Sequence, residues 1–165
     1  ALEAAVQHLL EHSEVVRPEW VDGNGHFNLA YYAVTFDHAT DAFLDYLDLF
    51  HDYTARSRCA LFALEMHLAY VRELLGGDPI RFTTLFLGFD DKRLHFFHEM
   101  YHGDEGRLAA TCELFFLNVD VGRRRAAPFS AADAARLAKV KAAHGRLPRP
   151  PQVGRVTRLR NRSTG

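Results

Sequence analysis

Residues 79–120 restrict the fold most, because three apolar runs there are separated only by short turns. The runs span 79–89, 93–102 and 107–120, and the turns are Asp-Asp-Lys at 90–92 and Gly-Asp-Glu-Gly at 103–106. Turns of this length join antiparallel neighbours as hairpins. We therefore expect an antiparallel sheet. Residues 60–73, followed by a Gly-Gly-Asp turn at 76–78, and residues 14–20 are expected to add strands, the latter at an edge or bulge because it contains Pro18.

Residues 28–50 follow a different pattern. They contain no Gly or Pro, are rich in Ala, Tyr, Phe and Leu, and are apolar on more than one face. This predicts a long, largely buried helix. Shorter helices are expected at 2–11 and 130–143, the second with Ser130 and Asp133 as an N-cap pair. One buried helix beside an antiparallel sheet is an α+β fold with the sheet wrapped on the helix.

Length and charge indicate one domain with a basic tail. A chain of 165 residues suits a single domain, which we place at 1–150, followed by a basic tail at 151–165. Residues 145–165 carry six arginines and no acid, whereas residues 1–144 carry 14 basic and 21 acidic residues. Such a tail is either a solvated segment or a source of arginines for a phosphorylated ligand or a neighbouring subunit. The net charge of −1 gives no global field that favours nucleic acid.

Cysteine usage and hydropathy point to the cytoplasm. Cys59 and Cys112 are far apart and match no metal spacing, which indicates two free thiols in a reducing compartment. No stretch approaches the roughly 18 apolar residues of a membrane span. We expect a cytoplasmic protein without a membrane partner.

The segment Glu19–Tyr32, EWVDGNGHFNLAYY, has the composition of a site. Asn28 is a good N-cap type at the start of the expected long helix, where unpaired N–H groups and the helix dipole favour an anion. Gly23 and Gly25 let the backbone bend and let a ligand approach closely. Asp22 then places a carboxylate near donors for a developing oxyanion, the minimum for acyl transfer. The alternative is that the segment is turn and capping chemistry alone.

The same segment resembles the hot-dog fold thioesterases of the 4-hydroxybenzoyl-CoA thioesterase type. The resemblance rests on Asp22, Gly25, His26 and Asn28, followed by Tyr31 and Tyr32, and on EMHLAYVREL, GGDPIRFTT, DDKRLHFFHEMYH and LAATCELFFLNVD further along. It covers about residues 14–150 and is nearest the branch that acts on carnitine-like and betaine-like CoA thioesters. Where many relatives have an acid two residues before the catalytic one, this chain has Trp20.

The resemblance implies roles for individual residues. Asp22 falls at the catalytic carboxylate, as nucleophile or as general base for water. Backbone N–H groups near Asn28 and Leu29 would polarise the thioester carbonyl, and His26 and Asn28 would hold the loop and touch the substrate. It further implies an acyl-CoA substrate, no cofactor other than the CoA of that substrate, and a homodimer or dimer of dimers with a shared site. Candidate partners for the CoA phosphates are Arg72, Arg81, Arg93 and 123–125.

Other residues are candidates for substrate contacts. Glu65 lies mid-strand among apolar residues, so it is either on the solvent face or a functional acid that contacts the loop of Asp22 or a cationic acyl group. Trp20 and Tyr32 are the aromatic residues nearest the motif and are candidates to enclose a quaternary ammonium. His95 and His98 point to opposite faces of a strand, which makes a shared metal site improbable, and we expect no metal.

Two other functions stay open from the sequence. The first is a hot-dog module that binds an acyl-CoA or similar ligand without cleaving it. The second is a hot-dog dehydratase, which usually needs an Asp/His pair placed differently from any in this chain.

Overall fold

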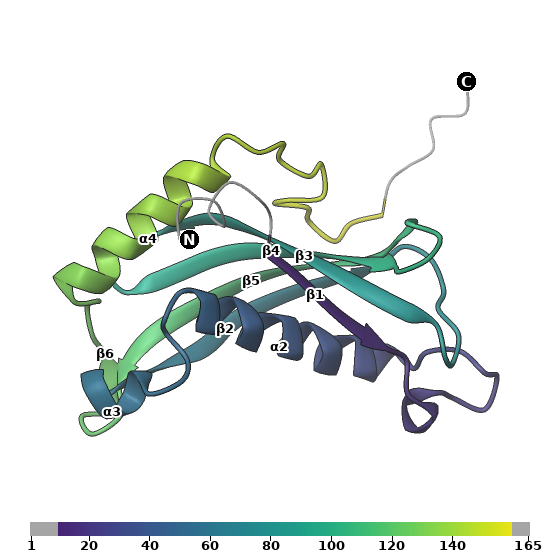
Figure 1. The fold of residues 1–165 in the computed structure, drawn as a ribbon, viewed down its shortest axis with the longest axis horizontal. Helices are drawn as coiled ribbons and strands as arrows, with labels where there is room; N and C mark the ends of the chain where they lie inside the picture. The colour runs from purple at the N-terminus through teal and green to yellow at the C-terminus, as the bar shows by residue number, and fades with distance from the viewer. Residues whose placement is uncertain (1–9, 160–165) are drawn as a thin grey trace.

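The fold is a curved antiparallel sheet with one long helix in its hollow (Figure 1). The computed structural model describes residues 10–159. Its elements, in chain order, are β1 (Leu10–Val15), a 3-10 turn η1 (Pro18–Trp20), α2 (Leu29–Tyr46), α3 (Tyr53–Ser57), β2 (Cys59–Tyr70), β3 (Pro79–Phe89), β4 (Arg93–His102), β5 (Leu108–Asp120), β6 (Arg125–Ala126) and α4 (Ala131–His144).

The sheet confirms the two predicted hairpins and adds a crossover. Its strand order is β1-β3-β4-β5-β2, with β6 paired to the end of β5, and every pairing is antiparallel. Residues 71–78 carry the chain from β2 at one edge to β3 on the far side of β4 and β5, so the Gly-Gly-Asp turn does not form a β2–β3 hairpin. As a result β1 and β2 are the two edge strands.

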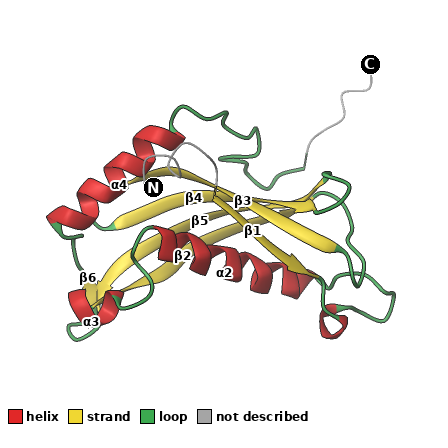
Figure 2. Ribbon diagram, in the orientation of Figure 1, coloured by secondary structure: helices red, strands yellow, loops and turns green. Residues whose placement is uncertain are grey.

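Helix α2 supplies the core that the sheet encloses (Figure 2). Its side chains Phe36 and Phe43 are fully buried, and they pack against Phe82, Phe86 and Phe96 of β3 and β4. The expected α+β architecture, a sheet wrapped on one long helix, is therefore confirmed. No described helix is long and apolar enough to cross a membrane.

Several expected boundaries were wrong. Residues 14–20 are not one strand: β1 ends at Val15, and Pro18 begins the 3-10 turn because its fixed φ suits the first position of a helical turn. The expected helix at 2–11 lies largely outside the described residues, but Leu10 and Glu11 belong to β1. The long helix ends at Tyr46 instead of residue 50, and Asp48 takes a left-handed backbone (φ 59°) that turns the chain toward α3.

The C-terminal part covers the opposite face of the sheet. Helix α4 begins at the predicted cap, where Ser130 accepts a hydrogen bond from the Asp133 N–H. At its other end the buried His144 accepts a hydrogen bond from the Phe86 N–H at the bulge of β3 (2.8 Å). The chain then continues over the sheet toward the end where α2 begins (Figure 1). The division of the chain at residue 150 stays a prediction.

Candidate active site

The segment from Asp22 to Asn28 forms a closed loop before α2. Val21 and Phe27 face each other across an antiparallel bridge, and the Asp22 N–H donates to the His26 carbonyl (2.9 Å). Gly25 has a φ of +81°, in the left-handed region that favours glycine, and open space surrounds the position of a Cβ there. The glycine is therefore required by backbone conformation and not by a close neighbour.

The loop holds the Asp22 carboxylate by one oxygen. Oδ1 accepts hydrogen bonds from the N–H groups of Asn24 (2.9 Å) and His26 (3.1 Å). Within residues 10–159 the other oxygen, Oδ2, has no hydrogen-bond partner, and the side chain is half-buried. Asp22 thus combines a fixed orientation with one free oxygen.

The start of α2 lies directly after this loop. Asn28 is the N-cap, and its side-chain oxygen accepts from the Ala30 N–H (3.0 Å). The Asn28 N–H itself donates to the Trp20 carbonyl (2.9 Å). The N–H of Leu29, the first helical residue, has no acceptor in the described part of the chain, and Leu29 is 67% exposed. Of the two amides expected to polarise a carbonyl, the Leu29 amide is the one left open.

A second loop, residues 71–78 between β2 and β3, packs against the first and is hydrogen-bonded to it. The Phe27 N–H donates to the Leu74 carbonyl (2.8 Å), and His26 forms an isolated bridge with Leu75. The His26 imidazole Nε2 lies 3.0 Å from a carboxylate oxygen of Glu73. His26 therefore links the two loops, and its role in the chemistry stays a prediction.

Comparison with known proteins identifies the family. Residues 16–138 match the Thioesterase-like superfamily, which is most of the chain and includes the loop and α2. The chain belongs to this superfamily. The membership confirms the resemblance to hot-dog thioesterases and the expectation of an acyl-CoA thioesterase.

Individual relatives agree with that assignment. A betainyl-CoA thioesterase from Pseudomonas aeruginosa is 39% identical over 93% of this chain and 96% of its own. An L-carnitine dehydrogenase/betainyl-CoA thioesterase from Ruegeria pomeroyi is 34% identical over 92% of this chain, which corresponds to 31% of that longer protein.

Solved structures show the same fold. The protein SAV2348 from Staphylococcus aureus, in complex with CoA, superposes with a TM-score of 0.86 at 27% identity, covering 93% of this chain and 97% of its own. A 1,4-dihydroxy-2-naphthoyl-CoA thioesterase from Synechocystis superposes with a TM-score of 0.68 at 14% identity, covering 87% of this chain and all of its own. The second likeness is one of fold alone.

In this thioesterase Trp20 is packed beneath the loop. It is 6% exposed, and its ring stacks on Tyr31 (6.1 Å between centroids) with the Arg17 guanidinium 4.8 Å from its centroid. The chain's own groups thus contact the indole. Whether the indole also reaches a substrate cation stays a prediction.

Tyr32 lies in a similar environment. It is 4% exposed and stacks on Phe27 (4.2 Å between centroids). Burial raises the pKa of its phenol to about 12, so the group is neutral at physiological pH. Its predicted role in holding an acyl group also stays a prediction.

Tyr70 is a residue of the site that sequence reasoning missed. It lies at the end of β2, is half exposed, and donates from its phenol to the Leu29 carbonyl (2.9 Å). Its ring meets that of Tyr32 edge-on at 5.0 Å. Only the fold brings the end of β2 to the start of α2, so no local signal marks Tyr70.

Glu65 lies elsewhere along the same strand. It is exposed, sits beside the β-bulge of β2 and pairs across the ladder with Phe115. Within residues 10–159 of one chain it contacts neither the Asp22 loop nor any basic group through a hydrogen bond or ion pair. A role for Glu65 therefore depends on a second subunit or a substrate.

The strand histidines are separated as expected. His98 is buried on the α2 side, between the hydroxyls of Thr40 (2.9 Å) and Thr84 (2.8 Å). His95 is on the other face, stacked on Phe115 (4.2 Å between centroids). In the described residues no three His, Cys, Asp or Glu side chains are grouped as metal ligands.

Proposed function

We propose that this thioesterase hydrolyses a short-chain acyl-CoA with Asp22 as the reacting carboxylate. The proposal rests on one observation: Asp22 has one oxygen fixed by the loop and one free, next to a helix start whose Leu29 amide is open. The Leu29 N–H would donate to the thioester carbonyl oxygen and stabilise the negative charge that develops there. Tyr70, bonded to the Leu29 carbonyl, would hold the next peptide, Leu29–Ala30, in place.

Two routes are compatible with this arrangement. As a general base, Asp22 takes a proton from water while the water oxygen attacks the carbonyl carbon; the C–S bond then breaks and CoA leaves as the thiolate. As a nucleophile, Asp22 attacks the carbon itself, CoA leaves, and water cleaves the resulting anhydride. Both routes yield the carboxylate of the acyl group, CoA as the thiol and one proton.

For the acyl group we propose a small cationic one of the betaine type. The supporting observation is the 39% identity with a betainyl-CoA thioesterase over nearly the full length of both chains. A quaternary ammonium binds well to aromatic faces and to carboxylates. Trp20, Tyr32 and Glu65 are the residues we assign to that contact.

We further propose that the working form is a homodimer, or a dimer of dimers, joined along β2. This edge strand carries three exposed apolar side chains, Phe62, Leu64 and Met66, which is unusual for an edge left in water. Pairing of two β2 edges would cover these side chains and bring Glu65 to the subunit boundary. The two free buried thiols, Cys59 and Cys112, and a CoA substrate support a cytoplasmic location.

A thiol-release assay distinguishes hydrolysis from the alternative, an acyl-CoA binding module without activity. Wild-type protein is mixed with betainyl-, carnitinyl-, benzoyl- and short aliphatic CoA esters, and free CoA is followed with a thiol dye. We expect release from the cationic esters to exceed that from the others. Ligand-induced thermal stabilisation without release from any ester would favour the binding module, and preference for a neutral acyl group would contradict the betaine assignment alone.

A further inference from the structure

The C-terminal segment 151–158, here called the strap, lies against the sheet and is fixed there by one carboxylate. Both oxygens of Glu113, on β5, accept the Gly154 N–H (2.6 and 3.1 Å). Gly154 has a φ of +74°, which favours glycine at the contact. The strap therefore has a defined position over β5, next to the edge strand β2.

The strap and β2 together form a groove. Residues His67–Tyr70 of β2 line one side, Arg155–Arg158 of the strap line the other, and the volume is about 250 Å³. Tyr70 belongs both to this groove and to the site, because its phenol bonds the Leu29 carbonyl. Tyr70 thus links the groove to the first residue of α2.

The strap side of the groove carries positive charge. Arg155 and Arg158 are exposed, and in the described residues neither guanidinium forms an ion pair or a hydrogen bond. Arg56, Arg93 and Arg136, in contrast, each contact an aspartate. The strap contains no acid, and Glu113 already accepts the Gly154 N–H, so the charge of the two strap arginines stays uncompensated.

We propose that this groove binds the phosphate groups of the CoA moiety, with Arg155 and Arg158 as the phosphate ligands. The inference rests on the proposed function, since it places the nucleotide end of the substrate whose thioester lies at Asp22. Guanidinium groups match phosphate oxygens in charge and in bidentate geometry. The strap arginines then determine affinity for CoA esters while the chemistry at Asp22 is unchanged.

The test uses a double variant, Arg155→Ala with Arg158→Ala, and three thioesters of one acyl group. The CoA ester carries all phosphates, the dephospho-CoA ester lacks the 3′-phosphate, and the pantetheine ester lacks the nucleotide. For the variant we expect KM for the CoA ester to rise roughly tenfold or more with kcat unchanged. KM for the pantetheine ester should not change, and the dephospho-CoA ester shows whether the 3′-phosphate is the group contacted.

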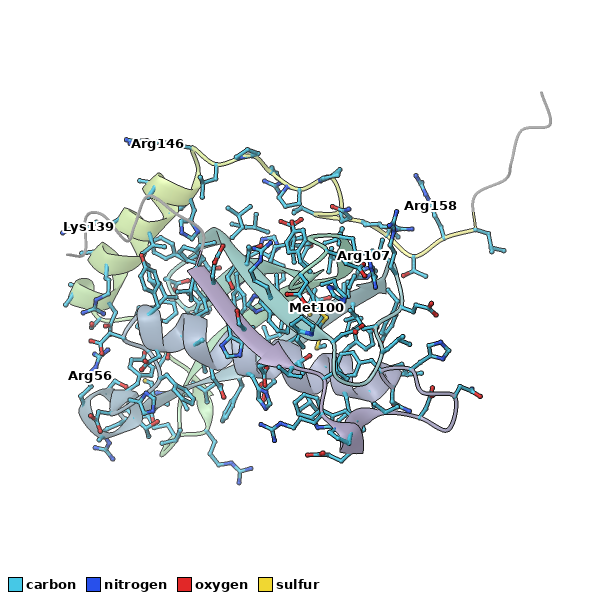
Figure 3. The ribbon with its side chains drawn as sticks, turned by 45° about the vertical axis from the view of Figure 1, so that its right-hand side comes forward. Arg56, Met100, Arg107, Lys139, Arg146 and Arg158 are labelled. Atoms are coloured by element: carbon cyan, nitrogen blue, oxygen red, sulfur yellow. The ribbon has the colours of Figure 1, made fainter. Side chains whose placement is uncertain are left out.

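A matched control removes two charges from the other end of the C-terminal region. Lys139 and Arg146 are exposed on and just after α4, away from Arg158 (Figure 3). Lys139→Ala with Arg146→Ala should leave KM for the CoA ester within about twofold of wild type. An equal rise in KM in the control, or an equal rise for the pantetheine ester in the strap variant, would overturn the proposal.

Binding of CoA itself separates this inference from the proposed function. Calorimetric titration of the full chain with CoA should show an affinity that is lost in the strap variant and retained in the control. If the wild type releases no thiol from any ester but still binds CoA through the strap, the hydrolase proposal fails and the groove stands. If hydrolysis is normal and the strap variant binds CoA as well as wild type, the groove assignment fails.

Discussion

At the residue scale, His98 is a neutral imidazole inside the core. Both ring nitrogens have hydroxyl partners, Thr40 from α2 and Thr84 from β3, and Phe36 and Phe96 pack on the ring. Burial, and secondarily the charge of His12, lowers the pKa of His98 to about 3. The helix and the sheet are thus joined by a polar contact that works only while His98 is uncharged.

The buried, neutral His98 predicts that the folded protein loses stability in acid. The folded pKa of His98 lies below its unfolded value near 6.5, so the unfolded state binds the extra proton. The contribution of neutral His98 to the free energy of unfolding is complete above pH 6.5. It is lost as the pH falls toward 3, at about 1.4 kcal/mol per pH unit below pH 6. Urea unfolding of wild type and His98→Gln from pH 7.5 to 5 measures this loss of stability. The glutamine amide still offers a hydrogen-bond partner to each of the two threonine hydroxyls.

Comparison of wild type with His98→Gln isolates the part of the acid dependence of stability that comes from His98. Burial also lowers the pKa of His144, so the wild type and the variant share that part of the acid dependence. The difference in unfolding free energy between them should shrink as the pH falls. A difference that is the same at every pH would show that His98 does not titrate between the folded and unfolded states.

At the scale of elements, the cap of α2 couples stability to the site. Asn28→Ala removes the acceptor for the Ala30 N–H and should lower the unfolding free energy by about 1 kcal/mol. Because the cap orients the first turn that presents the Leu29 amide, kcat should fall as well. Urea unfolding and thiol release measure the two effects.

Asn28→Ser is the matched control, because serine also caps well. It should recover most of the unfolding free energy and part of kcat. Loss of stability in Asn28→Ala without any change in kcat would separate the cap from the chemistry and contradict the role given to the helix start.

The elements also show what the sequence can and cannot reveal. The β3–β4 and β4–β5 hairpins follow from short polar turns, and α4 follows from Ser130, because these signals are local. The partner of β2 is not local information: a Gly-Gly-Asp turn suits a hairpin and a crossover equally well. Tyr70 was missed for the same reason, since its contact with Leu29 spans 41 residues of sequence.

At the scale of the whole molecule, the exposed apolar side chains of β2 predict an oligomer. Leu64→Lys places a charge on the centre of that edge and should shift the protein to monomer in sedimentation velocity, with loss of thiol release. Phe50→Lys is the control, because Phe50 is also exposed but lies in the loop after α2, outside β2. Unchanged sedimentation of Leu64→Lys, with circular dichroism like wild type, would rule out β2 as the interface.

The placement of the strap on the sheet is also a property of the whole molecule. The six arginines of residues 145–165 permitted either a solvated tail or a ligand contact, and composition alone does not choose between them. The Glu113–Gly154 contact brings residues 41 positions apart together and places Arg155 beside β2. Long-range placement of this kind has no signature in a single sequence.

The account depends most on Asp22 as the reacting group, and its direct test is turnover of Asp22→Asn. The amide oxygen can still accept from the Asn24 and His26 N–H groups, so the loop should keep its shape while the carboxylate is lost. We predict a fall in kcat of roughly 10²–10⁴-fold for the preferred CoA ester, with an unchanged melting temperature. The control Glu19→Gln, an exposed acid in the same segment, should match wild type. Turnover of Asp22→Asn within a few-fold of wild type would contradict the central claim.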